Sequence, residues 1–152
     1  MKKCVRRILS LVLILVLACA IAISCYAYES GYEFSAVGDA VLFNGVCFRT
    51  VVEGDESFAK ATMEEVASDG TRFSGTVTLE YTYCPENQLR PSAYVTGTIS
   101  RNFTSISGAR YIDYFASYYD LMIDATGRSS VTKTINNEPH TMETDAVTIY
   151  IY

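Results

Sequence analysis

An alternation of apolar and polar residues marks positions 71–83 as a β-strand. The apolar side chains recur at a spacing of two and would line one face of the strand: Phe73, Val77, Leu79, Tyr81 and Tyr83. The dipeptide Asp69-Gly70 precedes this run, and it tolerates the positive φ angles of a tight hairpin turn. The pattern therefore predicts a half-buried strand that follows a hairpin turn.

Residues 58–67 fit two patterns. A helix would place its apolar residues on one stripe and end at Gly70 as a C-cap. A strand would place Ala59, Ala61 and Met63 on one face, and a bulge at Glu64-Glu65 would add Val66 to that face. We favour the strand, because the bulged register sets these residues opposite the apolar face of 71–83.

Further hairpins are predicted elsewhere. Asn44-Gly45 separates the β-forming runs 40–43 and 46–52. A second turn is expected at 124–127, where Gly127 would supply the left-handed position between strands 118–123 and 128–135. Residues 93–103 form another predicted strand, introduced by a loop at 85–91.

The last part of the chain combines an exposed loop with a strand. Residues 136–145 are polar and are expected to form the loop. The run from Ala146 to Tyr152 is rich in Val, Ile and Tyr and is expected to be a strand. It could be central in a sheet, or it could be an edge strand that pairs between copies and makes oligomers.

Short strands, frequent turns and the lack of a long helical stripe predict an all-β fold, namely a small antiparallel β-sandwich or a small barrel. We take an immunoglobulin-like architecture as a working hypothesis. The chain has no tryptophan, whereas true immunoglobulin domains pack one against their disulfide. No motif points to a particular family.

The first 27 residues have the three parts of a secretory signal. The basic residues Lys2, Lys3, Arg6 and Arg7 come first. An apolar helix-forming run over 8–23 follows, and small residues at Cys25 and Ala27 favour cleavage between Ala27 and Tyr28. The organisation predicted is a signal peptide at 1–27 and a single all-β domain at 28–152, which would be secreted or displayed on the cell surface.

Two alternatives share this direction of export. The apolar run approaches the ~20 residues that span a bilayer, so it could remain as an uncleaved anchor. Segments ending at Cys19 and Cys25 loosely resemble the lipobox of bacterial lipoproteins, in which the cysteine is acylated. In either case the N-terminal segment would be the domain's only link to the membrane.

The charge balance limits the class of partner. The chain has 12 basic and 17 acidic residues, and the signal segment holds four of the basic ones. The remaining domain has 8 basic against 17 acidic residues and a net charge of −9. Phosphate backbones would repel it, so we expect no nucleic-acid partner.

Only Cys47 and Cys84 lie outside the signal segment, out of five cysteines in the chain. In an oxidising compartment such a pair predicts one disulfide. The alternatives are two thiols or metal ligands, but no CxxC pair or nearby histidine supports a zinc site.

The stretch 111–119 is the densest candidate for a binding surface. It contains Tyr111, Asp113, Tyr114, Tyr118 and Tyr119. Exposed tyrosine rings can stack on the apolar faces of sugars, and a carboxylate can accept hydroxyl hydrogen bonds. The same residues are also ordinary sheet formers whose rings fill cores, and this structural role is the commoner one for tyrosine in a sheet.

Candidate chemistry elsewhere is weak. Ser130 and Lys133 fit S-x-x-K, but they fall on a predicted strand and the companion motifs are missing. His140, the single histidine, lies near Glu143 and Asp145, and such a polar loop is usually just solvated. We therefore expect no catalytic residues, no metal and no cofactor.

The leading hypothesis is an exported, disulfide-stapled β-sandwich of a bacterial envelope that is not an enzyme. It would bind a protein or a glycan, or serve as a structural module. The alternatives are a small outer-membrane β-barrel, and a secreted hydrolase or toxin whose site matches no recognised motif and which would be tested at His140.

Overall fold

A computed structural model describes residues 32–70, 72–87, 93–106 and 108–152. The predicted signal segment and its cleavage site at Ala27 and Tyr28 lie outside these residues. Within the described residues, no helix has the length and apolar character needed to cross a membrane.

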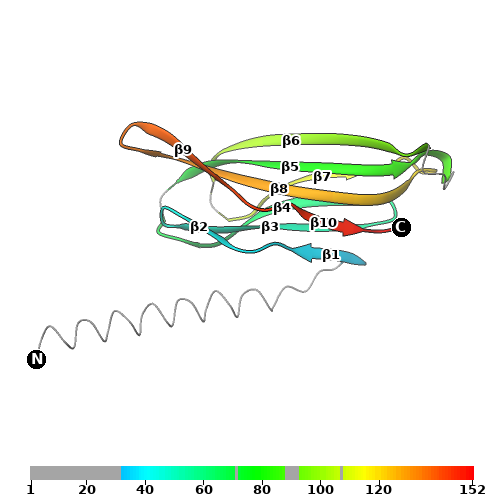
Figure 1. Ribbon diagram of the computed structural model, residues 1–152, viewed down its shortest axis with the longest axis horizontal. Coiled ribbons are helices and arrows are strands. Elements are labelled where there is room, and N and C mark those ends of the chain that lie inside the picture. Colours follow the sequence, from blue (N-terminus) through cyan, green and yellow to red (C-terminus); the bar gives the residue numbers. More distant parts are fainter. Residues whose placement is uncertain (1–31, 71, 88–92, 107) are drawn as a thin grey trace, which may run out of the picture.

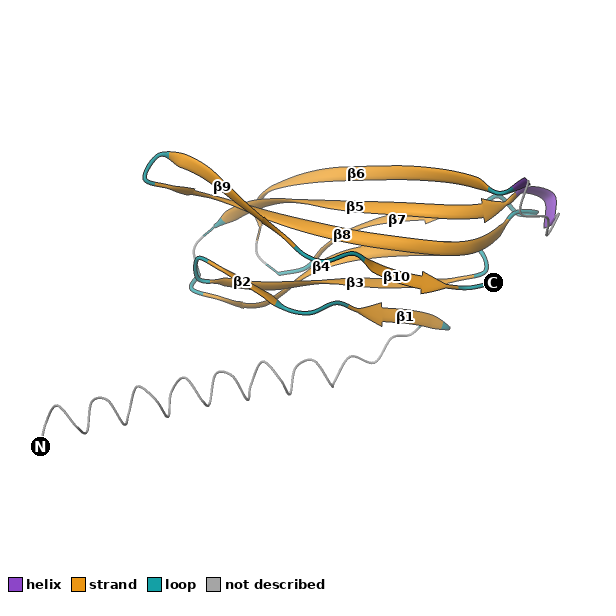
Figure 2. Ribbon diagram, viewed as in Figure 1, coloured by secondary structure: helices purple, strands orange, loops and turns teal. Residues whose placement is uncertain are grey.

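Nearly all of the described chain is antiparallel β-structure in two five-stranded sheets (Figures 1 and 2). The first sheet contains β1 (Phe34–Val37), β2 (Val41–Phe43), β3 (Val46–Asp55), β4 (Phe58–Ser68) and β7 (Arg110–Phe115). The second contains β5 (Phe73–Cys84), β6 (Val95–Ile106), β8 (Leu121–Ile135), β9 (Glu138–Glu143) and β10 (Val147–Tyr150). A short 3-10 turn, η1 (Pro85–Asn87), follows β5.

Each sheet is four strands wide, because two short strands share one edge. In the first sheet β1 and β2 both pair with β3, which is followed by β4 and β7. In the second sheet β9 and β10 both pair with β8, which is followed by β5 and β6. The chain changes sheet between β4 and β5, between β6 and β7, and between β7 and β8.

The inward faces of the two sheets form one core. Apolar side chains at alternate positions of strands from both sheets are buried together: Val46, Phe48, Val52, Ala59, Ala61, Met63, Phe73, Val77, Leu79, Met122, Ala125, Val131, Val147, Ile149 and Ile151. The predicted alternation in 71–83 is therefore confirmed. The strand chosen for 58–67 is also confirmed, with Ala59, Ala61 and Met63 on the inward face.

Local turn chemistry was predicted correctly at one hairpin. Asn44 and Gly45 have φ angles of 44° and 83° and join β2 to β3. The bulge expected at Glu64-Glu65 lies one position later. Phe48 pairs with Glu65 and Cys47 with Ala67, so Val66 has no partner in β3.

The hairpin expected at Asp69-Gly70 is wrong. β4 pairs with β3 and β7, and the link through Gly70, whose φ is 83°, carries the chain to the other sheet. β4 instead forms its hairpin with β3, where the Asp55 carboxylate accepts hydrogen bonds from Ser57 N and Oγ at 2.8 and 2.9 Å. The inward residues of 58–67 and 73–84 thus share one core by facing each other across it.

The turn expected at 124–127 is also wrong, because β8 runs unbroken through it. Gly127 does not have a positive φ, and a Cβ there would lie only 2.5 Å from Val52 Cγ2 of the first sheet. The turn that ends β8 is at Asn136 and Asn137, with φ angles of 53° and 66°. The stretch expected as a loop therefore contains β9, whose residues are all exposed and whose hairpin projects beyond the sheets in Figure 1.

The C-terminal run is an edge strand of the second sheet. β10 pairs only with β8, through Val147 to Tyr150, and Ile151 N donates a hydrogen bond to Ile123 O at 2.8 Å. Val147 and Ile149 enter the core, where Val147 lies beside Gly38 in the β1–β2 link and Ile149 lies beside Gly54 of β3. Pairing of this edge between copies stays a prediction.

Buried hydroxyls also join the two sheets. Thr50 Oγ1 on β3 donates to Ser129 Oγ on β8 at 2.8 Å and lies 2.7 Å from Thr144 Oγ1. Ser129 N donates to the same Thr144 hydroxyl at 3.1 Å. All three side chains are buried, and the hydrogen bonds offset the cost of removing them from water.

The predicted disulfide is not formed, because its cysteines lie at opposite ends of the sheets. Cys84 pairs with Leu121, next to Met122, whose amide donates to Glu56 O in the β3–β4 turn. Cys47 precedes that turn by eight residues of β3, which is about 26 Å of strand. Disulfide geometry needs Cα atoms within about 7 Å.

We expect Gly127→Ala to destabilise the domain. A Cβ at this position would lie 2.5 Å from Val52 Cγ2, 3.0 Å from Ala61 Cβ and 3.1 Å from Thr50 Cγ2. Overpacking of this kind costs about 1–3 kcal/mol, which urea denaturation can measure. The exposed neighbour Arg128→Gln should change the free energy of unfolding by less than ~0.5 kcal/mol, and equal effects would contradict close approach at Gly127.

We also expect both cysteines of the domain to remain reduced. Thiol titration of the domain from residue 28 onward, denatured without reductant, should find two reactive thiols. Both cysteines are buried, so the folded protein should react slowly. A mass two units lower, with no reactive thiol, would restore the disulfide and require a different strand arrangement.

Candidate functional site

The candidate site lies on the outward face of the first sheet, beside the β3–β4 turn. β4 and β7 pair with Phe58 opposite Phe115, Lys60 opposite Asp113, and Thr62 opposite Tyr111. Side chains alternate between the faces of a strand, so these residues point outward while Ala59 and Ala61 point into the core. The register of β4 against the core therefore sets which side chains reach the site.

Four aromatic rings surround a hollow of about 430 Å³, here called the aromatic pocket. Its lining residues are Tyr32, Asp55, Ser57, Phe58, Lys60, Tyr111, Asp113 and Phe115. The Phe58 ring is 4.7 Å from the Phe115 ring and 5.2 Å from the Tyr32 ring, measured between centroids. Phe58 is buried, while Tyr111 and Phe115 are 55% and 68% exposed. The pocket thus has an apolar floor and accessible aromatic walls.

Lys60 places a positive charge among these rings. Its Nζ lies 2.6 Å from the buried Glu53 carboxylate. The same atom lies over the Tyr32 ring at 4.9 Å and over the Tyr111 ring at 5.9 Å. These contacts fix the ammonium group on the pocket wall, and cation–π attraction adds to the ion pair. Asp55 and Asp113 supply carboxylate acceptors beside it.

Only some of the five residues that the sequence indicated as a binding surface lie in the aromatic pocket. Tyr111 and Asp113 line the aromatic pocket. Tyr114 points into the interface between the sheets, where its ring stacks on Tyr81 at 3.8 Å. Tyr118 and Tyr119 follow β7 and are 92% and 70% exposed, with their rings edge-to-face at 5.0 Å. Two of the five residues therefore belong to the site.

Sequence reasoning missed Tyr32, Phe58, Lys60 and Phe115. The period of two in β7 groups Phe115 with Tyr111 and Asp113, and that signal was available. The pairing of β4 with β7 joins segments about fifty residues apart, and no local pattern reports such a pairing.

Tyr114 belongs to a cluster that closes the side of the core. Its ring lies 3.8 Å from Tyr81 and 6.0 Å from Tyr83, measured between centroids. Tyr81 pairs with Gly97 across β5 and β6, and a Cβ on Gly97 would collide with the Tyr81 ring. Burial raises the pKa of Tyr114, and the neighbouring Tyr81 and Tyr83 raise it further.

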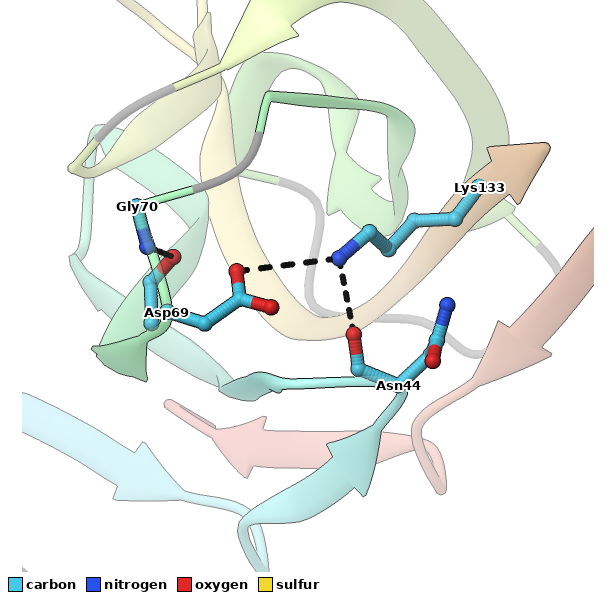
Figure 3. Close-up of polar contacts among 5 residues, drawn as sticks. Asn44, Asp69, Gly70 and Lys133 are labelled. Carbon is cyan, nitrogen blue, oxygen red and sulfur yellow. Dashed lines mark hydrogen bonds and ion pairs between the residues drawn. The ribbon is translucent and has the colours of Figure 1, made fainter. Parts of the chain in front are cut away.

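A second hollow, of about 490 Å³, lies at the opposite end of the sheets. Lys133 Nζ donates to Asn44 O at 2.7 Å and lies 3.8 Å from an Asp69 carboxylate oxygen (Figure 3). Asp69 N donates to Gly45 O at 2.9 Å. These contacts tie the β2–β3 turn and the β4–β5 link to β8, so the polar groups of this hollow stabilise the fold.

The other sequence candidates do not converge. Ser130 and Lys133 are three residues apart on one strand and point to opposite faces of β8. His140 is exposed on β9. In the part of the chain that the structure describes, no three His, Cys, Asp or Glu side chains are close enough to hold a metal ion.

Comparisons with protein-family models, with curated protein sequences and with solved structures find no match for this chain.

Alkaline pH should weaken the fold through Tyr114. Its pKa in the folded state lies above the ordinary value of 10.0, so the folded protein keeps a proton that the unfolded chain loses. The free energy of unfolding therefore falls as pH rises above about 10. We expect Tyr114→Phe to reduce this loss in thermal melts followed by circular dichroism. Tyr118→Phe, at an exposed site, is the control and should follow the parent protein.

Proposed function

We propose that this chain is an exported, non-catalytic domain that binds carbohydrate at the aromatic pocket. The observation that carries the proposal is the combination, in one hollow, of four aromatic rings, one ammonium group and two carboxylates. Small-molecule sites typically combine apolar walls with a few well-placed polar groups.

The chemistry of a sugar ring matches these groups. Its C–H face packs on an aromatic ring such as Tyr111 or Phe115. Its hydroxyls donate to the carboxylates of Asp55 and Asp113 and accept from Lys60. The Phe58 ring and the Glu53–Lys60 ion pair hold the pocket in place before the ligand arrives. A preformed site loses less conformational entropy on binding.

Export is proposed from the signal-like pattern of residues 1–27. The acidic domain would then work outside the cytoplasm, with the membrane touched only by an uncleaved or acylated N-terminal segment. Extracellular glycans would be within reach there.

We further propose that the fold is a β-sandwich of immunoglobulin-like topology. The order β3-β4-β7 corresponds to strands A-B-E of that topology, and the order β6-β5-β8-β10 corresponds to C′-C-F-G. The three changes of sheet along the chain also agree with it. β1 and β2 would then be additions on the outer edge of strand A.

One observation favours a second candidate, which is binding of an extended peptide by strand addition. Ala116 N donates to Ser57 O, in the turn just before β4, at 2.9 Å. Antiparallel strands direct alternate residues to each neighbour, so Tyr111, Asp113 and Phe115 direct their backbone groups away from β4. An extended peptide could pair with that edge of β7.

Binding should be tested on a glycan array and then by calorimetry. We expect Tyr111→Ala and Phe115→Ala each to weaken binding roughly tenfold or more, the equivalent of about 1.4 kcal/mol, because each removes a stacking face. Tyr118→Ala and Tyr119→Ala are matched controls, since these exposed tyrosines lie outside the pocket.

Two results would argue against carbohydrate binding. One is that no glycan on the array binds the protein. The other is that the pocket variants and the control variants lose affinity equally. Binding of extended peptides with the same dependence on Phe115 would instead favour strand addition at β7.

A further inference from the structure

A third hollow, of about 350 Å³, adjoins the aromatic pocket at β7 and is here called the arginine pocket. Tyr111 and Asp113 line both hollows. The remaining wall of the arginine pocket includes Arg101 and Phe103 from β6 and Arg110 at the start of β7. A ligand that fills the aromatic pocket can therefore continue across β7 into the arginine pocket.

The two arginines differ from three other basic side chains of the domain. Arg49, Lys60 and Lys133 each form an ion pair with a carboxylate. Among the described residues, no carboxylate lies within salt-bridge distance of Arg101 or Arg110. Their positive charge is therefore available to a ligand, although the domain as a whole is acidic, with 8 basic against 17 acidic residues and a net charge of −9.

Local contacts hold both guanidinium groups at this wall. The Arg101 guanidinium lies over the Phe103 ring, 5.5 Å from its centroid. Arg110 Nη1 donates to Ala109 O at 2.8 Å. These contacts leave other N–H groups of each guanidinium to donate, and a guanidinium can bind a carboxylate through two parallel hydrogen bonds.

We propose that the ligand is an acidic polysaccharide whose sugars carry carboxylates. One sugar packs in the aromatic pocket, and the carboxylate of a neighbouring sugar binds Arg101 and Arg110. This inference rests on the proposed carbohydrate binding and adds the ligand's charge. A neutral glycan of the same shape would use the aromatic pocket alone.

The test uses an array in which each acidic polysaccharide is paired with its carboxyl-reduced form. The reduced form has a neutral hydroxymethyl group in place of each carboxylate, and the sugar backbone is otherwise the same. We expect reduction to weaken binding to the parent protein by roughly tenfold or more, the usual scale for losing a charge-assisted hydrogen bond. Added salt should weaken binding of the acidic forms and leave that of the neutral forms unchanged.

Three variants assign the preference to residues. Arg101→Gln and Arg110→Gln should each lower the ratio of acidic to neutral affinity, while affinity for the reduced forms stays constant. Arg128→Gln is the matched control, because Arg128 is an exposed arginine on β8 and lines neither the aromatic nor the arginine pocket. Thermal melts should be the same for all three variants.

The outcomes separate the two proposals. If acidic and reduced forms bind equally, and the Arg101 and Arg110 variants change nothing, the charge preference is wrong and carbohydrate binding stands. If the Arg128 variant lowers the ratio as much as the other two, general charge attraction explains the preference, and the arginine pocket is wrong. If no glycan binds in either form, both proposals fail.

Discussion

The close approach of the two sheets at Gly127 is the constraint on which the rest of the structure depends. A residue without Cβ lets β8 pass directly over Val52 and Ala61 of the first sheet. The hydroxyls of Thr50 and Ser129 are then near enough to form a hydrogen bond inside the core. A larger residue at 127 would hold the sheets apart, and it would separate these polar groups after they had lost their hydration.

This contact sets the orientation of the candidate site through the strand period. Ala61 packs beneath Gly127, so the inward set of β4 is fixed to Ala59, Ala61 and Met63. Phe58 and Lys60 must then point outward, together with the residues of β7 that pair with them. A shift of one residue in the register of β4 would turn Lys60 into the core, where its charge would be costly to bury. The core thus determines which side chains reach the pocket.

Much of the architecture could be predicted, because apolar alternation and turn dipeptides are local signals. The strand at 71–83 and the Asn44-Gly45 turn follow directly from such signals, whereas 58–67 also fits a helical stripe and is assigned as a strand by its register against 71–83. Strand partners could not be predicted, because residues 58–67 and 73–84 would bury the same residues either as neighbours in one sheet or as opposed strands across a core. Gly127 was misassigned for a related reason: a glycine that permits close packing looks the same in sequence as one that permits a turn. Tyr111 and Asp113 were found through composition, whereas Lys60 and Tyr32 join them only through tertiary pairing.

The charged side chains near the site fall into two classes: those that form ion pairs within a sheet, and those that a ligand can reach. On the outward face of β3 and β4, Arg49 pairs with Glu64 and Lys60 with Glu53, directly across the strands. Each pair joins a positive and a negative side chain on adjacent strands, so these four residues leave no net charge on that part of the face. β7 and β6 are edge strands with one strand neighbour each, so Arg101, Arg110 and Asp113 have fewer residues beside them with which to pair. Edge position therefore accounts for the access of a ligand to these residues. A binding surface that wraps around an edge strand can in this way combine a rigid aromatic pocket on the sheet face with charges that the sheet itself does not neutralise.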